Sequence, residues 1–109
     1  WRQIAANNGV YCFSIIPGNV SYYRSGNCIE IAEAPLNAGA ERVLWHEIAH
    51  HYTMGSGRYD CASLGRSLGG NQETWAQAYT QYNWGWSADW AYAPASQSYI
   101  DSMANAGCL

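Results

Sequence analysis

Three residues of the segment His46-Glu47-Ile48-Ala49-His50 have types and spacing that suit metal chemistry. On an α-helix, positions i and i+4 lie on one face about one turn apart, so the imidazoles of His46 and His50 can bind the same metal ion. Glu47 lies beside them, and its carboxylate can reach a water molecule on that ion. The alternative is that both histidines are structural and hydrogen-bond to backbone or water. The spacing favours a zinc site over that alternative.

HEIAH on a helix resembles the active-site helix of the zincin metallopeptidases. The resemblance implies that His46 and His50 bind Zn²⁺, which activates a water molecule. It also implies that Glu47 takes a proton from that water as it attacks a peptide carbonyl, and then passes the proton to the leaving amine. A catalytic zinc ion takes three protein ligands, so one more is needed.

Three patterns could supply the third ligand. The metzincin pattern needs a glycine three residues and a histidine or aspartate six residues past His50, but Thr53 and Ser56 hold these positions. Asp60 stays open, although its spacing does not match the aspzincin pattern. Glu73 begins ETWAQAYTQY, which resembles the glutamate helix of the gluzincins. The chain therefore most resembles a minimal gluzincin, of the size of the minigluzincins, with Glu73 as third ligand. Otherwise, Glu73 is only a first-turn acid favoured by the helix dipole.

The same resemblance indicates further residues of the site. Gluzincins often use a tyrosine or histidine to stabilise the oxyanion, and Tyr59 is the first candidate here, with Arg58 and Arg66 as alternatives. In some gluzincins, an acid four residues after the ligand glutamate orients a histidine ligand. Gln77 holds that position in this chain, so any such contact would go through an amide. His51 points about 100° away from its neighbour around the helix and is expected behind the site or on the surface.

Cap residues and hydrophobic spacing predict the elements that position these side chains. One helix is expected over residues 37–54, capped by Asn37 and ended by Gly55, and a second over residues 71–82, capped by Asn71. The glycine-rich segment 55–70 is predicted to be an irregular loop. Strands are expected at residues 10–16, 20–24 and 28–34 as an antiparallel meander, and a last helix at 95–106.

The expected fold class is α+β and zincin-like. It has a small antiparallel or mixed sheet, packed on a central active-site helix and a second helix that bears the ligand glutamate. The resemblance further implies that an edge strand of the sheet binds the substrate in extended form.

Length and composition limit the classes of protein. With 109 residues, of which 49% are hydrophobic, we expect one domain over residues 1–109. The four cysteines favour two disulfides, Cys12–Cys28 and Cys61–Cys108, although two other pairings are possible, and they predict a secreted, extracellular protein. A net charge of −3 and five scattered arginines argue against nucleic-acid and membrane binding. The expected partner is a peptide or protein substrate, and the expected state is a monomer.

A second hypothesis is a secreted binding module. The chain has six tryptophans and nine tyrosines, and residues 84–90 could bind carbohydrate or protein. In that case Glu47 would be dispensable and zinc structural or absent. The motif favours the first hypothesis, a secreted zinc endopeptidase with Glu47 and Tyr59 catalytic and zinc bound by His46, His50 and Glu73.

Overall fold

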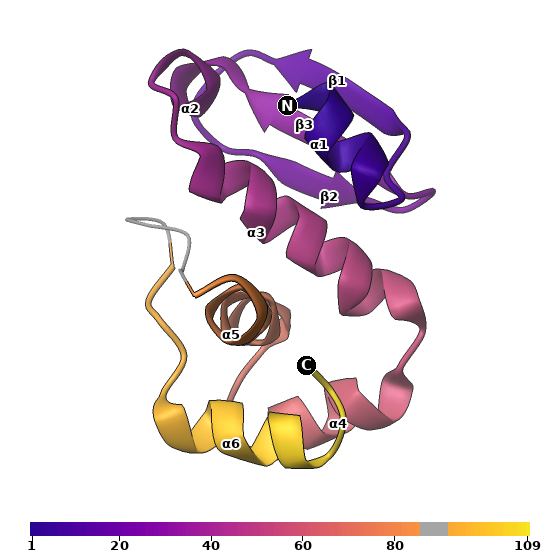
Figure 1. The fold of residues 1–109 in the computed structure, drawn as a ribbon, viewed down its shortest axis with the longest axis vertical. Helices are drawn as coiled ribbons and strands as arrows, with labels where there is room; N and C mark the ends of the chain where they lie inside the picture. Colours follow the sequence, from indigo (N-terminus) through magenta and orange to yellow (C-terminus); the bar gives the residue numbers. More distant parts are fainter. Residues whose placement is uncertain (86–91) are drawn as a thin grey trace.

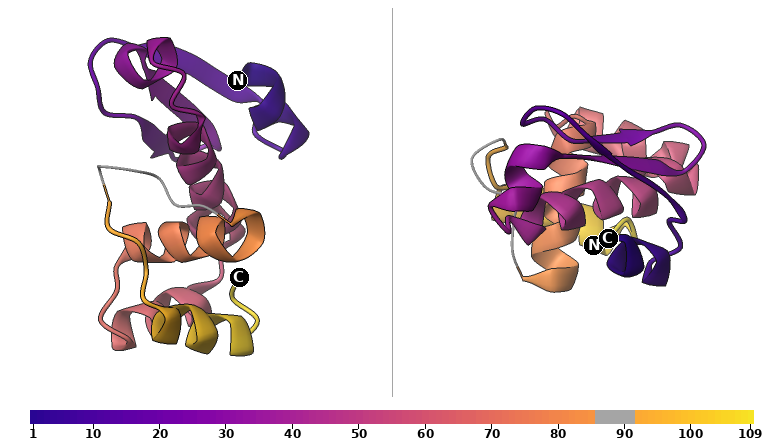
Figure 2. Two further views of the ribbon diagram at one scale, coloured as in Figure 1. Left: turned by 60° about the vertical axis from the view of Figure 1, so that its left-hand side comes forward. Right: turned by 90° about the horizontal axis from the view of Figure 1, so that it is seen from above.

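The structure is a computed structural model and describes residues 1–85 and 92–109. It is α+β: the sheet and α1 lie at one end, α4, α5 and α6 at the other, and α3 runs between them (Figures 1 and 2). No helix among the described residues is long and apolar enough to cross a membrane. In chain order the elements are α1 (Arg2–Asn7), β1 (Cys12–Ile16), β2 (Tyr22–Arg24), β3 (Cys28–Ala32), α2 (Glu33–Asn37), α3 (Glu41–Tyr52), the 3₁₀ helix η1 (Met54–Ser56), α4 (Tyr59–Ser67), α5 (Gln72–Trp84) and α6 (Gln97–Asn105).

The three strands form one mixed sheet in the order β1-β3-β2. β1 runs parallel to β3, with Cys12 opposite Cys28, and β2 runs antiparallel to β3. The predicted antiparallel meander is therefore wrong, because it would place β2 in the middle. β3 takes the centre since Ile29 and Ile31 are fully buried, whereas β1 and β2 keep exposed positions. The predicted disulfide Cys12–Cys28 is present and links the parallel pair.

Helix α3 carries both histidines and is shorter than predicted. It begins at Glu41 rather than at Asn37, because residues 33–37 form the separate helix α2 and Gly39 turns the chain with a φ of +68°. Leu44 and Ile48 of α3 are fully buried in the core beneath the sheet. One face of α3 is thus occupied by the sheet, and the other face is left for α5.

The prediction that Gly55 ends this helix is also wrong. The helix ends at Tyr52, and the residue with left-handed backbone after η1 is Gly57, with a φ of +72°. Gly55 instead allows Tyr23 to lie close to the backbone, because a Cβ at this position would lie 2.6 Å from Oη of Tyr23. The 3₁₀ helix η1, which follows α3, therefore lies directly against Tyr23 of β2.

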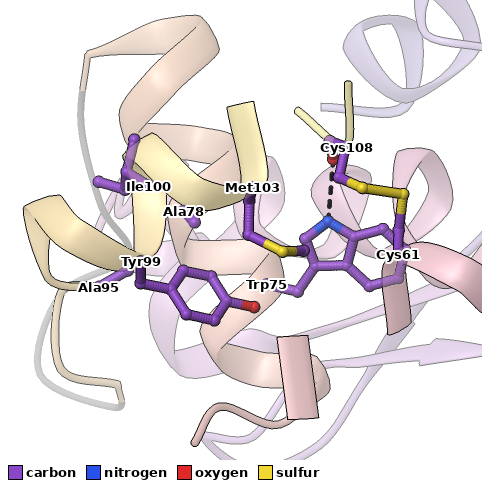
Figure 3. Packing of buried hydrophobic residues seen from close by; sticks show 8 residues of the cluster. All are labelled: Cys61, Trp75, Ala78, Ala95, Tyr99, Ile100, Met103 and Cys108. Atoms are coloured by element: carbon purple, nitrogen blue, oxygen red, sulfur yellow. Dashed lines mark hydrogen bonds between the residues drawn. A yellow bond between two sulfur atoms is a disulfide. The ribbon is translucent and has the colours of Figure 1, made fainter. Parts of the chain in front are cut away.

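Residues 55–70 are not an irregular loop, since they contain α4. Glycine content indicates a loop, but Gly65 lies inside α4 and allows close packing: a Cβ there would lie 2.8 Å from Oη of Tyr99. The second core lies here, and in it Nε1 of Trp75 donates to the carbonyl oxygen of Cys108 at 3.0 Å (Figure 3). The predicted disulfide Cys61–Cys108 is present and ties α4 to the C-terminus.

Four aromatic side chains join α3 to α5. Ring centroids lie 4.6 Å apart for Trp45 and Trp84, and 5.3 Å apart for Tyr52 and Tyr79. Each pair has one ring from each helix, so burial of these rings holds the two helices together. Trp75 of α5 is buried, and Tyr79 and Trp84 are partly buried, as their helical spacing predicts for core packing. Tyr82 has the same spacing but is 56% exposed, so the prediction is wrong for that residue.

The two disulfides should contribute unequally to stability. Cys12–Cys28 joins residues 16 apart and Cys61–Cys108 residues 47 apart. In the chain-entropy model the longer loop constrains the unfolded chain more, so replacing Cys61 and Cys108 by alanine should cost about 4 kcal/mol, against about 3 kcal/mol for the other pair. Urea unfolding of the two double variants measures this. A larger loss from the shorter loop would contradict the prediction.

Candidate metal centre

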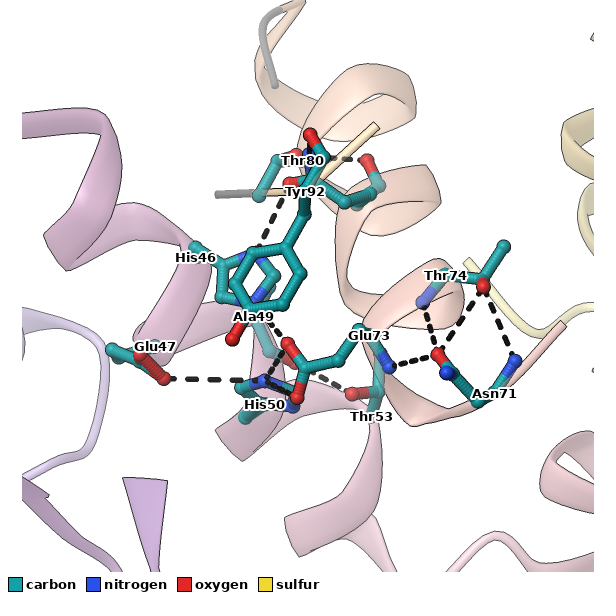
Figure 4. Close-up of polar contacts among 11 residues, drawn as sticks. His46, Glu47, Ala49, His50, Thr53, Asn71, Glu73, Thr74, Thr80 and Tyr92 are labelled. Carbon is teal, nitrogen blue, oxygen red and sulfur yellow. Dashed lines mark hydrogen bonds and ion pairs between the residues drawn. The ribbon is translucent and has the colours of Figure 1, made fainter. Parts of the chain in front are cut away.

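Helices α3 and α5 bring three ligand-type side chains together (Figure 4). His46 and His50 come from one face of α3, and Glu73 comes from the first turn of α5. Nε2 of His46 lies 2.7 Å from the Glu73 carboxylate, and Nε2 of His50 lies 3.2 Å from it. One potential ligand atom from each residue lies within 4.8 Å of the others, so the group could hold a metal ion.

The imidazole of His46 is held in one orientation by Gln77. Nδ1 of His46 lies 3.0 Å from Oε1 of Gln77, and Nε2 of Gln77 donates to the carbonyl oxygen of Tyr92, also at 3.0 Å. Because that carbonyl only accepts, the amide turns its oxygen toward His46, which assigns the hydrogen to Nδ1. The Nε2 atom of His46 therefore faces Glu73, which is the arrangement a metal ligand needs.

The short contact between His46 and Glu73 requires a proton or a metal ion between the two side chains. With Nδ1 protonated, Nε2 of His46 and a carboxylate oxygen would be two acceptors only 2.7 Å apart. A proton on Nε2 satisfies them in the metal-free protein. Burial acts to lower the pKa of His46, but the carboxylates of Glu73 and Glu47 outweigh it and raise that pKa. A metal ion can take the place of this proton.

Glu73 is positioned by the cap of α5. Oδ1 of Asn71 accepts from the backbone N–H groups of Glu73 and Thr74, and Oγ1 of Thr74 accepts from the Asn71 N–H, which forms a capping box. The cap fixes the first turn, and so it also fixes the start of the Glu73 side chain. Partial burial acts to raise the pKa of Glu73, but the two histidines hold it well below its usual range.

Glu47 lies beside the three-residue group without belonging to it. It is 4% exposed, and its Oε1 lies 3.9 Å from Nε2 of His50. Burial raises the pKa of Glu47, and the two histidines lower it by less. A buried carboxylate at this position is placed to accept a proton from a water molecule and to return it.

His51 lies away from the metal centre. A Cβ on Gly9 would be 3.3 Å from Nε2 of His51, so this ring packs against the N-terminal segment. Burial lowers the pKa of His51.

The ring of His50 lies edge-on to that of His46, with centroids 4.8 Å apart. Nδ1 of His50 is buried and has no hydrogen-bond partner among residues 1–85 and 92–109.

The donor set fits zinc. Two imidazole nitrogens and one carboxylate oxygen are ligands that Zn²⁺ takes in catalytic sites. In a tetrahedral site with bonds of about 2.1 Å, ligand atoms lie about 3.4 Å apart. The distance of 3.2 Å from the Glu73 carboxylate to His50 is close to that spacing, the distance of 2.7 Å to His46 is shorter, and all three ligand atoms lie within 4.8 Å of one another.

The other residues predicted from the sequence lie outside this group. Asp60, the open alternative for the third ligand, is on the exposed start of α4 and pairs with Arg58 at 3.2 Å. Tyr59 is 85% exposed at the first position of α4. Arg58, Tyr59 and Arg66 do line a pocket that reaches Glu73, so they lie beside the metal group rather than within it.

Tyr92 is a site residue that the sequence analysis missed. Its ring stacks on His46, with centroids 4.6 Å apart and planes 8° from parallel. Burial raises the pKa of Tyr92, and the carboxylates of Glu73 and Glu47 raise it further. Its position follows from folding alone, because no helical spacing or motif distinguishes it from the other tyrosines. Within the candidate binding segment 84–90, residues 86–90 lie outside the described residues.

Replacing Glu73 should weaken zinc binding much more than replacing Asp60. We expect Glu73→Ala to lower the affinity for Zn²⁺ by about 100-fold or more, because a ligand is lost, whereas Asp60→Ala should leave it unchanged. Competition with a chromophoric zinc chelator measures both affinities. A loss confined to Asp60→Ala would instead make Asp60 the third ligand.

Gln77 offers a matched pair of variants. Gln77→Met removes the acceptor for Nδ1 of His46 at similar volume, and it should lower zinc affinity roughly 10- to 100-fold. Gln77→Glu keeps an acceptor oxygen, so we expect it to bind zinc more tightly than Gln77→Met does, by about tenfold or more. The same chelator competition compares them. Equal affinities would show that this hydrogen bond does not orient the ligand.

Comparison with known proteins adds no family to these observations. No protein-family model, no curated protein and no solved structure matches the chain. The resemblance to the zincins therefore rests on the residues themselves, namely the motif at 46–50 and Glu73.

Proposed function

We propose that the protein is a zinc-dependent endopeptidase with a zincin-like fold. The observation that carries the proposal is the buried carboxylate of Glu47 beside the group of His46, His50 and Glu73. Among the described residues, no fourth histidine, cysteine, aspartate or glutamate joins that group. Structural zinc sites usually take four protein ligands, whereas catalytic sites take three and leave one position open. The number of ligands therefore supports catalysis.

The residues around the group have chemistry that suits peptide hydrolysis. Zinc bound here would supply a Lewis acid that activates water and polarises the substrate carbonyl. Glu47 would accept a proton from water and deliver it to the leaving nitrogen, since its carboxylate is buried beside His50. Gln77 would keep His46 in the tautomer of a ligand. The hydroxyl of Tyr92 would donate to the substrate carbonyl oxygen, with Tyr59 at the pocket as the alternative donor.

An extended peptide could reach the site along β2. This strand is at an edge of the sheet, because it pairs only with β3. It is also the strand drawn nearest to α3 (Figure 1), and the ring of Tyr23 lies 6.4 Å from that of His50. A peptide that added to β2 as a further strand would pass beside the metal group.

The disulfides and the aromatic residues bear on where the protein acts and on the alternative of a binding module. Two disulfides are typical of proteins in oxidising compartments, which supports action outside the cell. A binding module would need aromatic rings on its surface. Trp84, the one aromatic residue of segment 84–90 that the structure describes, contacts Trp45, Tyr52 and Tyr79 between α3 and α5, which favours a packing role for it. Exposed rings do occur elsewhere, at Tyr11, Tyr59 and Tyr82.

Glu47→Gln separates the two hypotheses. We expect the zinc-loaded protein to cleave members of a peptide library, and we expect Glu47→Gln to lower kcat/KM roughly 10²- to 10⁴-fold because the proton acceptor is lost. Mass spectrometry of the digests measures cleavage, and chelator competition shows that the variant still binds zinc.

The matched control is Asp60→Ala, which alters an exposed acid outside the group and should cleave like the parent. If the zinc-loaded parent cuts no peptide, or if Glu47→Gln cuts as fast as the parent, the proposed function is wrong.

A further inference from the structure

A pocket lies directly beside the candidate metal centre. Its volume is about 510 Å³, which is in the range of sites that hold small ligands. It extends from Glu73 and Thr53 across to α4 and α6. The residues that determine its chemistry are Arg58, Arg66, Glu73, Trp75 and Tyr99.

The rim of the pocket carries both cationic and anionic side chains. Two of the five arginines of the chain line it, Arg58 and Arg66. Arg58 is already paired with Asp60, which does not line the pocket. Arg66 forms no ion pair with any residue that the structure describes. The acid at the rim is Glu73, whose charge would be taken up by the metal ion, so Arg66 is left to attract an anion.

The inner wall combines aromatic surface with a hydroxyl group that has no partner. Trp75 is 4% exposed and Tyr99 is 5% exposed. Oη of Tyr99 is buried and has no hydrogen-bond partner among the described residues. It lies against Gly65, which also lines the pocket. Such a wall suits the aliphatic part of a side chain, with polar groups reserved for its end.

We propose that this pocket is a subsite for a carboxylate-bearing residue of the peptide, and that Arg66 binds the carboxylate. A guanidinium group offers two parallel N–H donors that match the two oxygens of a carboxylate. The carboxylate belongs to a glutamate or aspartate side chain in an endopeptidase substrate, whereas recognition of the C-terminus of the peptide would make the enzyme a carboxypeptidase. The inference rests on the proposed function, since it names the substrate class of the same site.

Peptide binding tests the subsite without requiring cleavage. The probes are acetylated, amidated octapeptides of alanine and serine that carry glutamate or glutamine at each position in turn, and the glutamine set with a free C-terminal carboxylate. Calorimetry measures their affinities for zinc-loaded Glu47→Gln. We expect a glutamate peptide to bind about tenfold more tightly than its glutamine partner if the side chain is recognised. The free acid should bind about tenfold more tightly than the amide if the terminus is recognised.

Charge reversal at Arg66 identifies the residue responsible. Arg66→Glu should reverse the preference and Arg66→Gln should abolish it. The control is Arg2→Glu in α1, an exposed arginine that contacts the Phe13 carbonyl and should keep the preference. A melting temperature for each variant shows that it is folded. Equal affinities within about twofold, or a preference that survives both Arg66 variants, would overturn the subsite.

The two proposals can fail separately. If the parent protein does not cleave peptides but the preference for a carboxylate depends on Arg66, the endopeptidase is wrong and the binding subsite stands. If the parent cleaves peptides and shows no preference, the subsite is wrong and the endopeptidase stands.

Discussion

The rest of the site depends on the 2.7 Å contact between Nε2 of His46 and the carboxylate of Glu73. These are two acceptors in a partly buried contact, and they stay together only with a proton or a metal ion between them. Gln77 makes the requirement strict because it accepts the hydrogen of Nδ1 and leaves Nε2 to face Glu73. In the metal-free protein a proton lies between the two atoms. A zinc ion would take the place of that proton and would also bind His50.

The fold has to hold α3 and α5 at a fixed separation for this contact to form. Aromatic pairs do so further along α5, where Tyr79 and Trp84 pack against α3. At the other end, the capping box of Asn71 sets the first turn, which contains Glu73. Trp75, two residues later, is packed into the C-terminal core (Figure 3) and held there by the Cys108 carbonyl. Glu73 is therefore supported from both sides by residues that lie outside the group of His46, His50 and Glu73.

Local patterns in the sequence predict much of the site and less of the fold. The spacing of the two histidines places them on one helix face, whereas Glu73 was indicated by the resemblance of its segment to the glutamate helix of the gluzincins. The parallel pairing of β1 with β3 could not be predicted, because it depends on which strand buries the most apolar surface in three dimensions. Helix α4 was not predicted, because glycines such as Gly65 indicate a loop when only the local sequence is considered. In the structure, Gly65 instead allows close contact with Tyr99. No motif or spacing in the sequence predicts the contact of Tyr92 with His46, because the two residues meet only when distant segments of the chain fold together.

The two disulfides close segments 12–28 and 61–108, which do not overlap. The histidines lie between these closed segments, and Glu73 lies inside the second one. A metal ion bound by all three would therefore act as a third cross-link, which joins the open stretch of chain to the C-terminal loop. Chelation would then loosen the junction between the two halves of the molecule while each half keeps its own covalent bond. The same ion would thus serve both the chemistry of the site and the stability of the fold.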